Sequence, residues 1–171
     1  MIFRKAVKDD FDNIKSLYWE LIDQEQEDPS FPHWKKGIHP SDEMLQNSIG
    51  KEELYVLADG SEIAACAIVN DEKVDGYADV LWQIDSDEVM VVHVLAVHPE
   101  QRGKGLARKL MEHIVVSERK AGKKALRLDV IENNTAAEGL YQKLGFQYIQ
   151  TKTLFYEVVG EMTFKMYELV L

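Results

Sequence analysis

A glycine-containing segment between an apolar stretch and an amphipathic stretch is the part of this sequence best suited to chemistry. It reads Gln101-Arg102-Gly103-Lys104-Gly105-Leu106-Ala107. Glycines let the backbone adopt left-handed conformations and approach a ligand closely. The first N–H groups of a helix have no internal partners, and together with the helix dipole they form an anion site. Because Arg102 and Lys104 add positive charge, the segment predicts a site for a pyrophosphate.

Two other nucleotide-binding patterns do not fit this segment. The P-loop requires Gly-Lys followed by Ser or Thr, whereas Lys104 is followed by Gly105. The dinucleotide-binding pattern requires a third glycine and a first strand–helix–strand unit, which are missing here. A glycine-rich turn that binds nothing is the alternative. A strand, a loop and a helix in this order favour the anion site.

The chain has the length and composition of one ordinary domain, and its charge is unevenly distributed. It has 171 residues, with 30 acidic and 20 basic residues and a net charge of −10, so we expect no binding to nucleic acid. Residues 100–124 nevertheless hold eight Lys or Arg against three Glu, a local net charge of +5. This basic island favours a small phosphorylated ligand, and a solvated helix face is the alternative.

Composition also limits the remaining classes. The single cysteine, Cys66, excludes an intramolecular disulfide and a cysteine-cluster zinc site, and we expect no metal. The start of the chain is charged too early for a signal peptide. No apolar run approaches the roughly 18 residues of a membrane helix, so we expect no membrane contact and a cytoplasmic protein.

Periodicity predicts the elements that must position the glycine segment. Near-continuous apolar character over 89–97 is typical of a central strand covered on both faces. Strands that first pair locally and then alternate with helices predict a mixed α/β sheet with helices on both faces. The predicted strands are 2–6, 54–58, 63–69, 77–83, 89–97, 126–131, 146–156 and 161–170, and the predicted helices begin near 10, 42, 105 and 134.

Two stretches together resemble a known family. Residues 102–107 resemble the Arg/Gln-x-x-Gly-x-Gly/Ala signature of the GNAT superfamily of N-acetyltransferases, and 95–99 match the strand end before it. Residues 134–146 resemble the second signature, Asn-x-x-Ala-x-x-Leu-Tyr-x-x-x-Gly-Phe. The detailed match covers 89–148, whereas the first 60 residues match only in outline. The resemblance implies one domain over 1–171, with a sheet of six to seven strands and about four helices, that transfers acetyl from acetyl-CoA.

The resemblance also implies which residues hold acetyl-CoA. Backbone N–H groups of about Gln101 to Ala107 would cradle the pyrophosphate. The strand end Leu95-Ala96-Val97 would present main-chain groups to the pantetheine arm. Asn134 would bond the pantetheine, and it is also a good helix N-cap; both roles can hold together.

Tyr141 is the general acid that the resemblance implies. A phenol can hydrogen-bond or protonate the thiolate that leaves when an amine attacks the thioester. The alternative is a plain core residue, because Ala137, Leu140, Tyr141 and Leu144 form an apolar stripe at helical spacing. With the family resemblance, we favour the acid.

The group that removes the proton of the amine is less clear from the sequence. His93 lies two residues before Leu95, so strict strand alternation puts both on one face, with Val97. A histidine is chemically apt, although many relatives have a carboxylate near this place and a lone strand histidine can be a buried structural group. Glu88 and a chain of waters are the alternatives.

The resemblance also implies an acceptor site shaped by the first two helices, the loop of residues 29–40 between them and the last strands, and we expect the acceptor to be a small-molecule or peptide amine. Acidic clusters at 20–28 and 85–88 would suit a cationic amine such as a polyamine, or they form a solvated surface. Trp34 and Trp82 are candidates for an aromatic wall or for ordinary packing. A homodimer is a further expectation, because the apolar final strand 162–171 is suited to pairing with a second copy.

The leading hypothesis is therefore an N-acetyltransferase that acts on a primary amine by direct transfer. A CoA-sensing module without turnover, a protein whose basic island docks an acidic partner, and an acetyltransferase for protein N-termini or lysines are the competing hypotheses.

Overall fold

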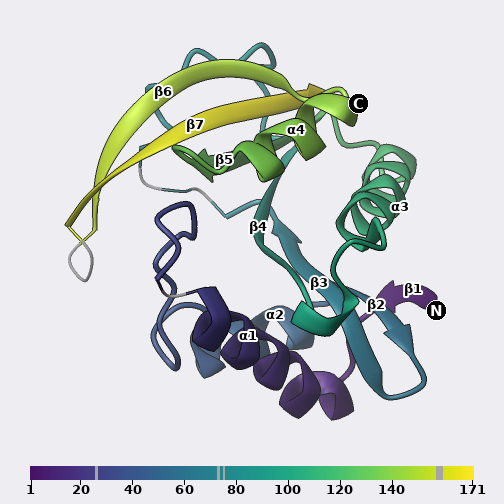
Figure 1. Cartoon of the computed structure of the whole chain (residues 1–171). Coiled ribbons are helices and arrows are strands. Elements are labelled where there is room, and N and C mark those ends of the chain that lie inside the picture. Colours follow the sequence, from purple (N-terminus) through teal and green to yellow (C-terminus); the bar gives the residue numbers. More distant parts are fainter. Residues whose placement is uncertain (26, 73, 75, 157–159) are drawn as a thin grey trace.

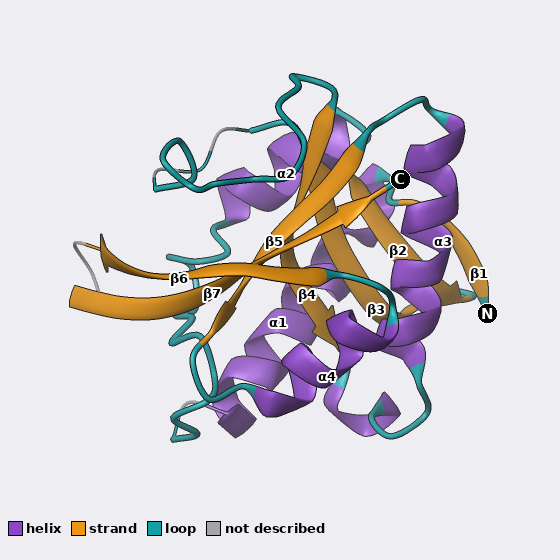
Figure 2. Ribbon diagram, turned by 90° about the horizontal axis from the view of Figure 1, so that it is seen from above, coloured by secondary structure: helices purple, strands orange, loops and turns teal. Residues whose placement is uncertain are grey.

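One seven-stranded sheet runs through the molecule in the order β1-β2-β3-β4-β5-β7-β6 (Figures 1 and 2). The computed structural model describes the whole chain except residues 26, 73, 75 and 157–159. Neighbouring strands are antiparallel, apart from the parallel pair β4–β5. The strands are β1 (Ile2–Lys5), β2 (Leu54–Asp59), β3 (Glu62–Asn70), β4 (Val89–Val97), β5 (Ala125–Ile131), β6 (Gln147–Tyr156) and β7 (Gly160–Val170).

Helices cover both faces of this sheet, as predicted. They are α1 (Phe11–Glu25), α2 (Asp42–Gly50), α3 (Leu106–Lys120) and α4 (Thr135–Lys143). Along β2, Val56 packs with α1 and α2, while its neighbours Tyr55 and Leu57 pack with α3 and α4. Because side chains alternate along a strand, a sheet covered on both faces needs apolar residues at nearly every position. The mixed α/β class with a sheet of six to seven strands and about four helices is confirmed.

The predicted helix starts are present with their caps. The hydroxyl of Ser41 accepts a 3.0 Å hydrogen bond from the backbone N–H of Met44 at the start of α2. The side chain of Asn134 accepts a 3.0 Å hydrogen bond from the N–H of Ala137 at the start of α4. Each cap satisfies a donor that the helix itself leaves unpaired.

The predicted strand at 77–83 is wrong. This segment forms turns, and its apolar residues Tyr77 and Val80 are buried against β5 and β7 instead of alternating in a ladder. Side-chain contacts fix the end of this segment. The carboxylate of Glu168 accepts a 2.7 Å hydrogen bond from the backbone N–H of Gln83 and a 2.9 Å hydrogen bond from the Nε–H of Arg127. Apolar packing without backbone pairing therefore produced a strand-like pattern.

The basis for the predicted homodimer is also wrong. The final strand β7 lies between β5 and β6, and over residues 164–168 it pairs with both, so this stretch of its backbone is not open to a second copy. The edge strand on this side is β6, which forms a long hairpin with β7 (Figure 1).

Among the helices that the structure describes, none has the length and apolar character needed to cross a membrane.

Candidate active site

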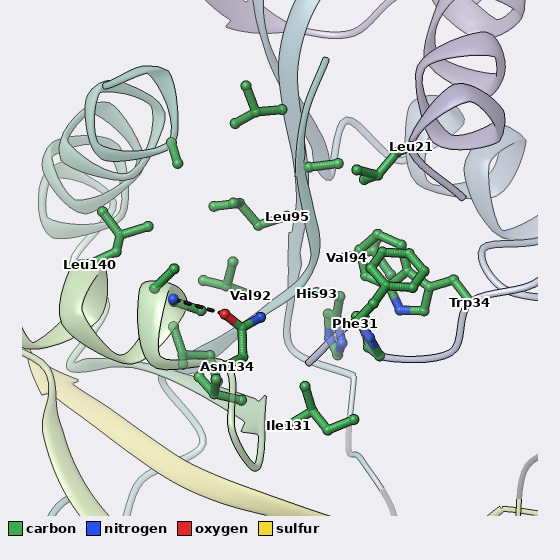
Figure 3. A pocket seen from close by; sticks show the side chains of 18 of the residues that line it. Leu21, Phe31, Trp34, Val92, His93, Val94, Leu95, Ile131, Asn134 and Leu140 are labelled. Atoms are coloured by element: carbon green, nitrogen blue, oxygen red, sulfur yellow. Dashed lines mark hydrogen bonds between the residues drawn. The ribbon is translucent and has the colours of Figure 1, made fainter. Parts of the chain in front are cut away.

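The two central strands separate halfway along their length, and a cavity opens between them. β4 and β5 pair only over residues 89–91 and 125–127. Beyond this point, residues 92–97 have no strand partner on the β5 side in the described part of the chain. A cavity of about 880 Å³ lies here, lined by β4, β5, α4, β7, the start of α3 and the segment 31–39 (Figure 3). The separation thus exposes a backbone edge that an extended ligand can pair with.

A β-bulge in β4 decides which side chains face which wall. Val94 has a φ of 46°, a value that β-branched residues rarely adopt, and the register against β3 shifts at this point. Val92 and Leu95 pack toward α3 and α4, whereas Val94 packs toward α1 and α2. His93 lies on the side of Val94 (Figure 3). The prediction that His93 shares a face with Leu95 and Val97 is therefore wrong, because the bulge inserts one residue into the alternation.

The glycine segment has the backbone geometry of an anion site. Gly105 is the N-cap of α3 with a φ of 70°, and Gly103 has a φ of 76°. A Cβ added to either glycine would meet no atom within 4 Å, so the space beside the loop is open. Within the described residues, the N–H groups of residues 103–108 have no backbone acceptor. These donors point out of the start of a helix, as a pyrophosphate site requires.

The start of the predicted cradle needs a correction. The N–H groups of Gln101 and Arg102 donate to the carbonyls of His98 and Pro99 at 2.8 and 3.3 Å, since this stretch forms a 3₁₀ turn. The free donors therefore begin at Gly103 and not at Gln101.

The side chains of the glycine segment are held by neighbours. The guanidinium of Arg102 pairs with the carboxylate of Glu25 at the end of α1. The ammonium of Lys104 donates to the side-chain oxygen of Gln101 at 2.8 Å, and Lys104 does not line the cavity. The other predicted cofactor residues do line it: Leu95, Ala96, Val97, Gln101, Arg102, Gly103, Gly105, Leu106, Ala107 and Asn134.

Asn134 combines a cap with a place in the cavity wall. Its Oδ1 accepts the hydrogen bond from the N–H of Ala137, which is drawn as a dashed line in Figure 3. In the described part of the chain, its Nδ2 has no partner, so the two N–H donors of the amide remain available to a ligand.

Tyr141 lines the cavity from α4 and is 7% exposed. Its ring packs edge-on against Phe146, with ring centroids 5.6 Å apart. Burial raises the pKa of its phenol, and the charge of Asp129 raises it further. Among the described residues, none hydrogen-bonds its hydroxyl. A protonated donor therefore remains free at the cavity wall, which a plain core tyrosine would not need.

His93 and Glu88, the candidate bases, lie in different surroundings. Nε2 of His93 lies 3.0 Å from Oδ1 of Asn70, and burial lowers the pKa of the imidazole. Glu88 precedes the other end of β4, where its exposed carboxylate lies 3.9 Å from the ammonium of Lys124. Only His93 lines the cavity.

Asp129 is a cavity residue that the sequence analysis missed. It lies on β5, its carboxylate accepts a 2.7 Å hydrogen bond from the hydroxyl of Tyr77, and burial raises its pKa. The available signal was the one acidic residue within the apolar run of 125–131, Ala-Leu-Arg-Leu-Asp-Val-Ile. A carboxylate within an apolar strand needs a polar partner, which here comes from the distant residue Tyr77.

Beyond β4, the cavity wall is mainly aromatic and aliphatic. Phe31 and Trp34 pack edge-on with ring centroids 5.3 Å apart, and Ile131, Met162 and Phe164 line the same cavity. Of the two interpretations of the acidic clusters, the cavity lining favours the solvated surface, because among the described residues of 20–28 only the apolar Leu21 lines the cavity and none of 85–88 does. Trp82 packs on Arg127 instead, 4.4 Å from the guanidinium carbon to the ring centre.

Comparison with known sequences agrees with this geometry. Residues 11–146 match the acetyltransferase (GNAT) family. Over 75 residues, 43% of this chain, it is 37% identical to the L-amino acid N-acyltransferase MnaT of Escherichia coli, of which 44% is covered. Over 79 residues, 46% of this chain, it is 34% identical to the [ribosomal protein bS18]-alanine N-acetyltransferase of E. coli, of which 53% is covered. The matched part thus spans about half the length of these relatives.

Solved structures share the fold across the whole chain. The ribosomal-protein-S18-alanine N-acetyltransferase of E. coli superposes with a TM-score of 0.68 at 23% identity, covering 99% of this chain and 92% of that one. The Salmonella typhimurium protein yncA, solved with its cofactor acetyl-CoA, gives a TM-score of 0.72 at 20% identity, covering 100% and 94%. With a family match over most of its length and the same fold throughout, this chain belongs to the acetyltransferase (GNAT) family.

Proposed function

We propose that this protein is a single-domain N-acetyltransferase, over residues 1–171, that transfers acetyl from acetyl-CoA to a primary amine. One observation carries the proposal. A single cavity joins the open backbone donors that begin at Gly103, the unpaired edge of β4, the hydroxyl of Tyr141 and the imidazole of His93. Transfer needs these four elements within reach of one extended ligand and one amine.

The residues present fit acetyl-CoA. The free N–H groups of residues 103–108 and the start of α3 suit its pyrophosphate, and open space beside Gly103 and Gly105 leaves room for it. The unpaired main chain of Leu95 and Val97 suits the amide groups of the pantetheine arm, with Nδ2 of Asn134 as a further donor.

The chemistry assigned to this chain is acid–base catalysis of direct attack. His93 removes a proton from the ammonium group of the acceptor, and the amine nitrogen then attacks the thioester carbonyl. Tyr141 donates a hydrogen bond and then its proton to the sulfur as the C–S bond breaks. The second hydrogen that the nitrogen loses on forming the amide returns to the phenolate of Tyr141. Burial disfavours the charge on the phenolate and on the leaving thiolate alike, so a neutral phenol beside the sulfur is suited to this donation.

The acceptor is proposed to be an amine that carries an apolar group. Phe31, Trp34 and Phe164 provide an aromatic wall beyond His93. Asp129 contributes a carboxyl group to the same cavity, and its oxygens suit the ammonium group as acceptors. The relatives named for L-amino acids and for an N-terminal alanine supply the two acceptor classes to compare first. A cytoplasmic location agrees with such acceptors and stays a prediction.

Thermal unfolding with and without acetyl-CoA tests the cofactor site, with an adenosine nucleotide as control. At about 100 times Kd, binding adds about 2.7 kcal/mol, which for a chain of this size raises Tm by roughly 5–10 °C. No shift at saturating acetyl-CoA would overturn the proposal.

An acceptor panel tests the reaction. It compares apolar L-amino acids, a peptide with a free N-terminal alanine, a lysine peptide and a polyamine, with release of free CoA as the readout. We expect turnover with the apolar amines and little with the polyamine. Binding of acetyl-CoA without turnover on any amine would favour the CoA-sensing alternative.

A further inference from the structure

Asn70, at the end of β3, is buried directly beside His93. The residue is 5% exposed, and its Oδ1 lies 3.0 Å from Nε2 of the imidazole. In the antiparallel pair β3–β4, Ile68 lies opposite His93, so Asn70 is the diagonal neighbour on the same face. Asn70 does not line the main cavity, so it acts on that cavity only through the imidazole.

Two further partners determine which way the Asn70 amide points. Oε2 of Glu53 lies 3.2 Å from Nδ2, and a carboxylate only accepts, so the amide nitrogen faces Glu53. The backbone N–H of Glu72 lies 3.2 Å from the other end of the amide and only donates, so that end is the oxygen. Both contacts therefore place Oδ1 toward His93.

The hydrogen of the imidazole follows from this orientation. An amide oxygen only accepts, so Nε2 of His93 has to carry the hydrogen that bonds to Asn70. A neutral imidazole carries one such hydrogen, and Nδ1 then keeps its lone pair. In the part of the chain that the structure describes, no group hydrogen-bonds Nδ1, and the ring lines the cavity.

We propose that Asn70, held in turn by Glu53, is a positioning residue that fixes His93 in the Nε2–H tautomer and so presents Nδ1 as the proton acceptor. The inference rests on the proposed function. In the proton transfer, one hydrogen leaves the ammonium nitrogen of the acceptor for Nδ1, and the electron pair of the broken N–H bond stays on that nitrogen for its attack on the thioester. The bond from Nε2–H to Asn70 persists throughout.

The charges around His93 favour this assignment. When Nδ1 gains its proton the ring becomes positive, and the carboxylate of Glu72 stabilises that charge. Glu53 adds a second carboxylate through the amide of Asn70. Burial and the nearby His39 oppose the charge, so the ring is neutral and ready to accept a proton near neutral pH.

Nitrogen-15 NMR of the resting protein tests the tautomer directly. The ring signals of His93 are those that disappear in His93→Gln. We expect a protonated Nε2 and an unprotonated Nδ1 in the neutral ring. A proton on Nδ1, or an equal mixture of the two tautomers, would overturn the inference. Because this measurement needs no cofactor and no turnover, its failure is distinct from failure of the proposed function, and it remains available if an Asn70 variant does not fold.

Two matched substitutions test the positioning role. Asn70→Ala should shift both ring signals of His93 toward a tautomer mixture. It should also lower kcat/KM for the acceptor by about tenfold or more, a loss that stays within the ~10²–10⁴-fold contribution of a general base. Acetyl-CoA binding should be unchanged. A second, smaller cavity of about 260 Å³ is lined by Asn70 and by Asn47 of α2, but not by His93. Asn47→Ala removes an amide that has no hydrogen bond to His93 in the described part of the chain, and it should leave the signals and the rate unchanged. Unchanged ring signals and kinetics in Asn70→Ala would contradict the role.

Discussion

The hydroxyl of Tyr18 donates a 2.6 Å hydrogen bond to the carbonyl oxygen of Val94, and so joins the middle of α1 to the bulge in β4. In a regular ladder this carbonyl would bond to a neighbouring strand. The bulge turns it toward α1, where burial raises the pKa of the Tyr18 phenol and keeps it a donor. The contact therefore supports the backbone distortion within the part of β4 that no longer pairs with β5.

Removing this hydroxyl should affect both stability and the cavity. Tyr18→Phe leaves a buried carbonyl unpaired, and we expect the free energy of unfolding to fall by about 1–3 kcal/mol in urea titrations. Binding of acetyl-CoA should also weaken. Tyr55→Phe is the matched control, because it removes a buried 2.7 Å hydrogen bond to Glu118 away from the cavity. Equal loss of acetyl-CoA affinity in both variants would contradict a role for the bulge.

Substitution of Gly105 should abolish acetyl-CoA binding, and backbone strain alone should not account for this loss. Gly105→Glu places a negatively charged side chain in a left-handed position beside the anion site, so acetyl-CoA binding measured by calorimetry should disappear. Gly122→Glu is the control, since Gly122 also has a positive φ of 79° and open surroundings, but follows the far end of α3. Each substitution should cost about 1–2 kcal/mol of stability. Retained affinity in Gly105→Glu would refute the assigned loop.

If Tyr141 is the general acid, removing its hydroxyl should lower kcat without weakening acetyl-CoA binding. Tyr141→Phe keeps the ring that packs on Phe146 and removes only the hydroxyl, so acetyl-CoA affinity should persist while kcat falls by roughly 10²–10⁴. Single-turnover rates across the accessible pH range are the measurement. A rate near that of the unsubstituted protein at every pH would show that Tyr141 is a packing residue and not the acid.

His93 predicts linked changes in activity and stability with pH. Burial lowers its pKa in the folded protein, so below about pH 6.5 the unfolded chain binds a proton that the folded chain resists. The free energy of unfolding should therefore fall as the pH drops from about 6.5 through the folded pKa. The acid limb of kcat/KM should lie in the same range, because a base must be neutral.

Substitution separates this histidine from the others. His93→Gln should remove the acid limb and its part of the pH dependence of unfolding. His113→Gln is the control, because His113 stacks on Phe3 from α3 and does not line the cavity. If both variants keep the acid limb of kcat/KM that the unsubstituted protein shows, His93 is not the base.

Local patterns were sufficient for the glycine loop, the two signatures and most elements. The caps at Ser41 and Asn134 lie three residues from the groups they bond, so adjacent sequence contains the whole interaction. The same holds for the left-handed glycines at the start of α3. Such features depend on side-chain type and backbone freedom over a few residues.

Features that depend on distant contacts were missed or misassigned. The strand-like residues 77–83 pack on β5 and β7 without pairing, and the final strand lies inside the sheet because β6 folds back along it. Both outcomes depend on which strands meet. An alternating apolar pattern predicts which residues are buried, but it does not predict which strand or loop they pack against.

The sequence by itself thus determined the family, the mixed sheet and the glycine loop at the start of α3, since each follows from short-range spacing. Only the tertiary structure decided that His93 faces away from Leu95, because the bulge at Val94 depends on contacts with β3 and on Tyr18, which is 76 residues away. It likewise brought Asp129 to Tyr77 and Asn70 to His93. Those pairs come from different strands and loops, and folding alone determines which polar groups share a buried site.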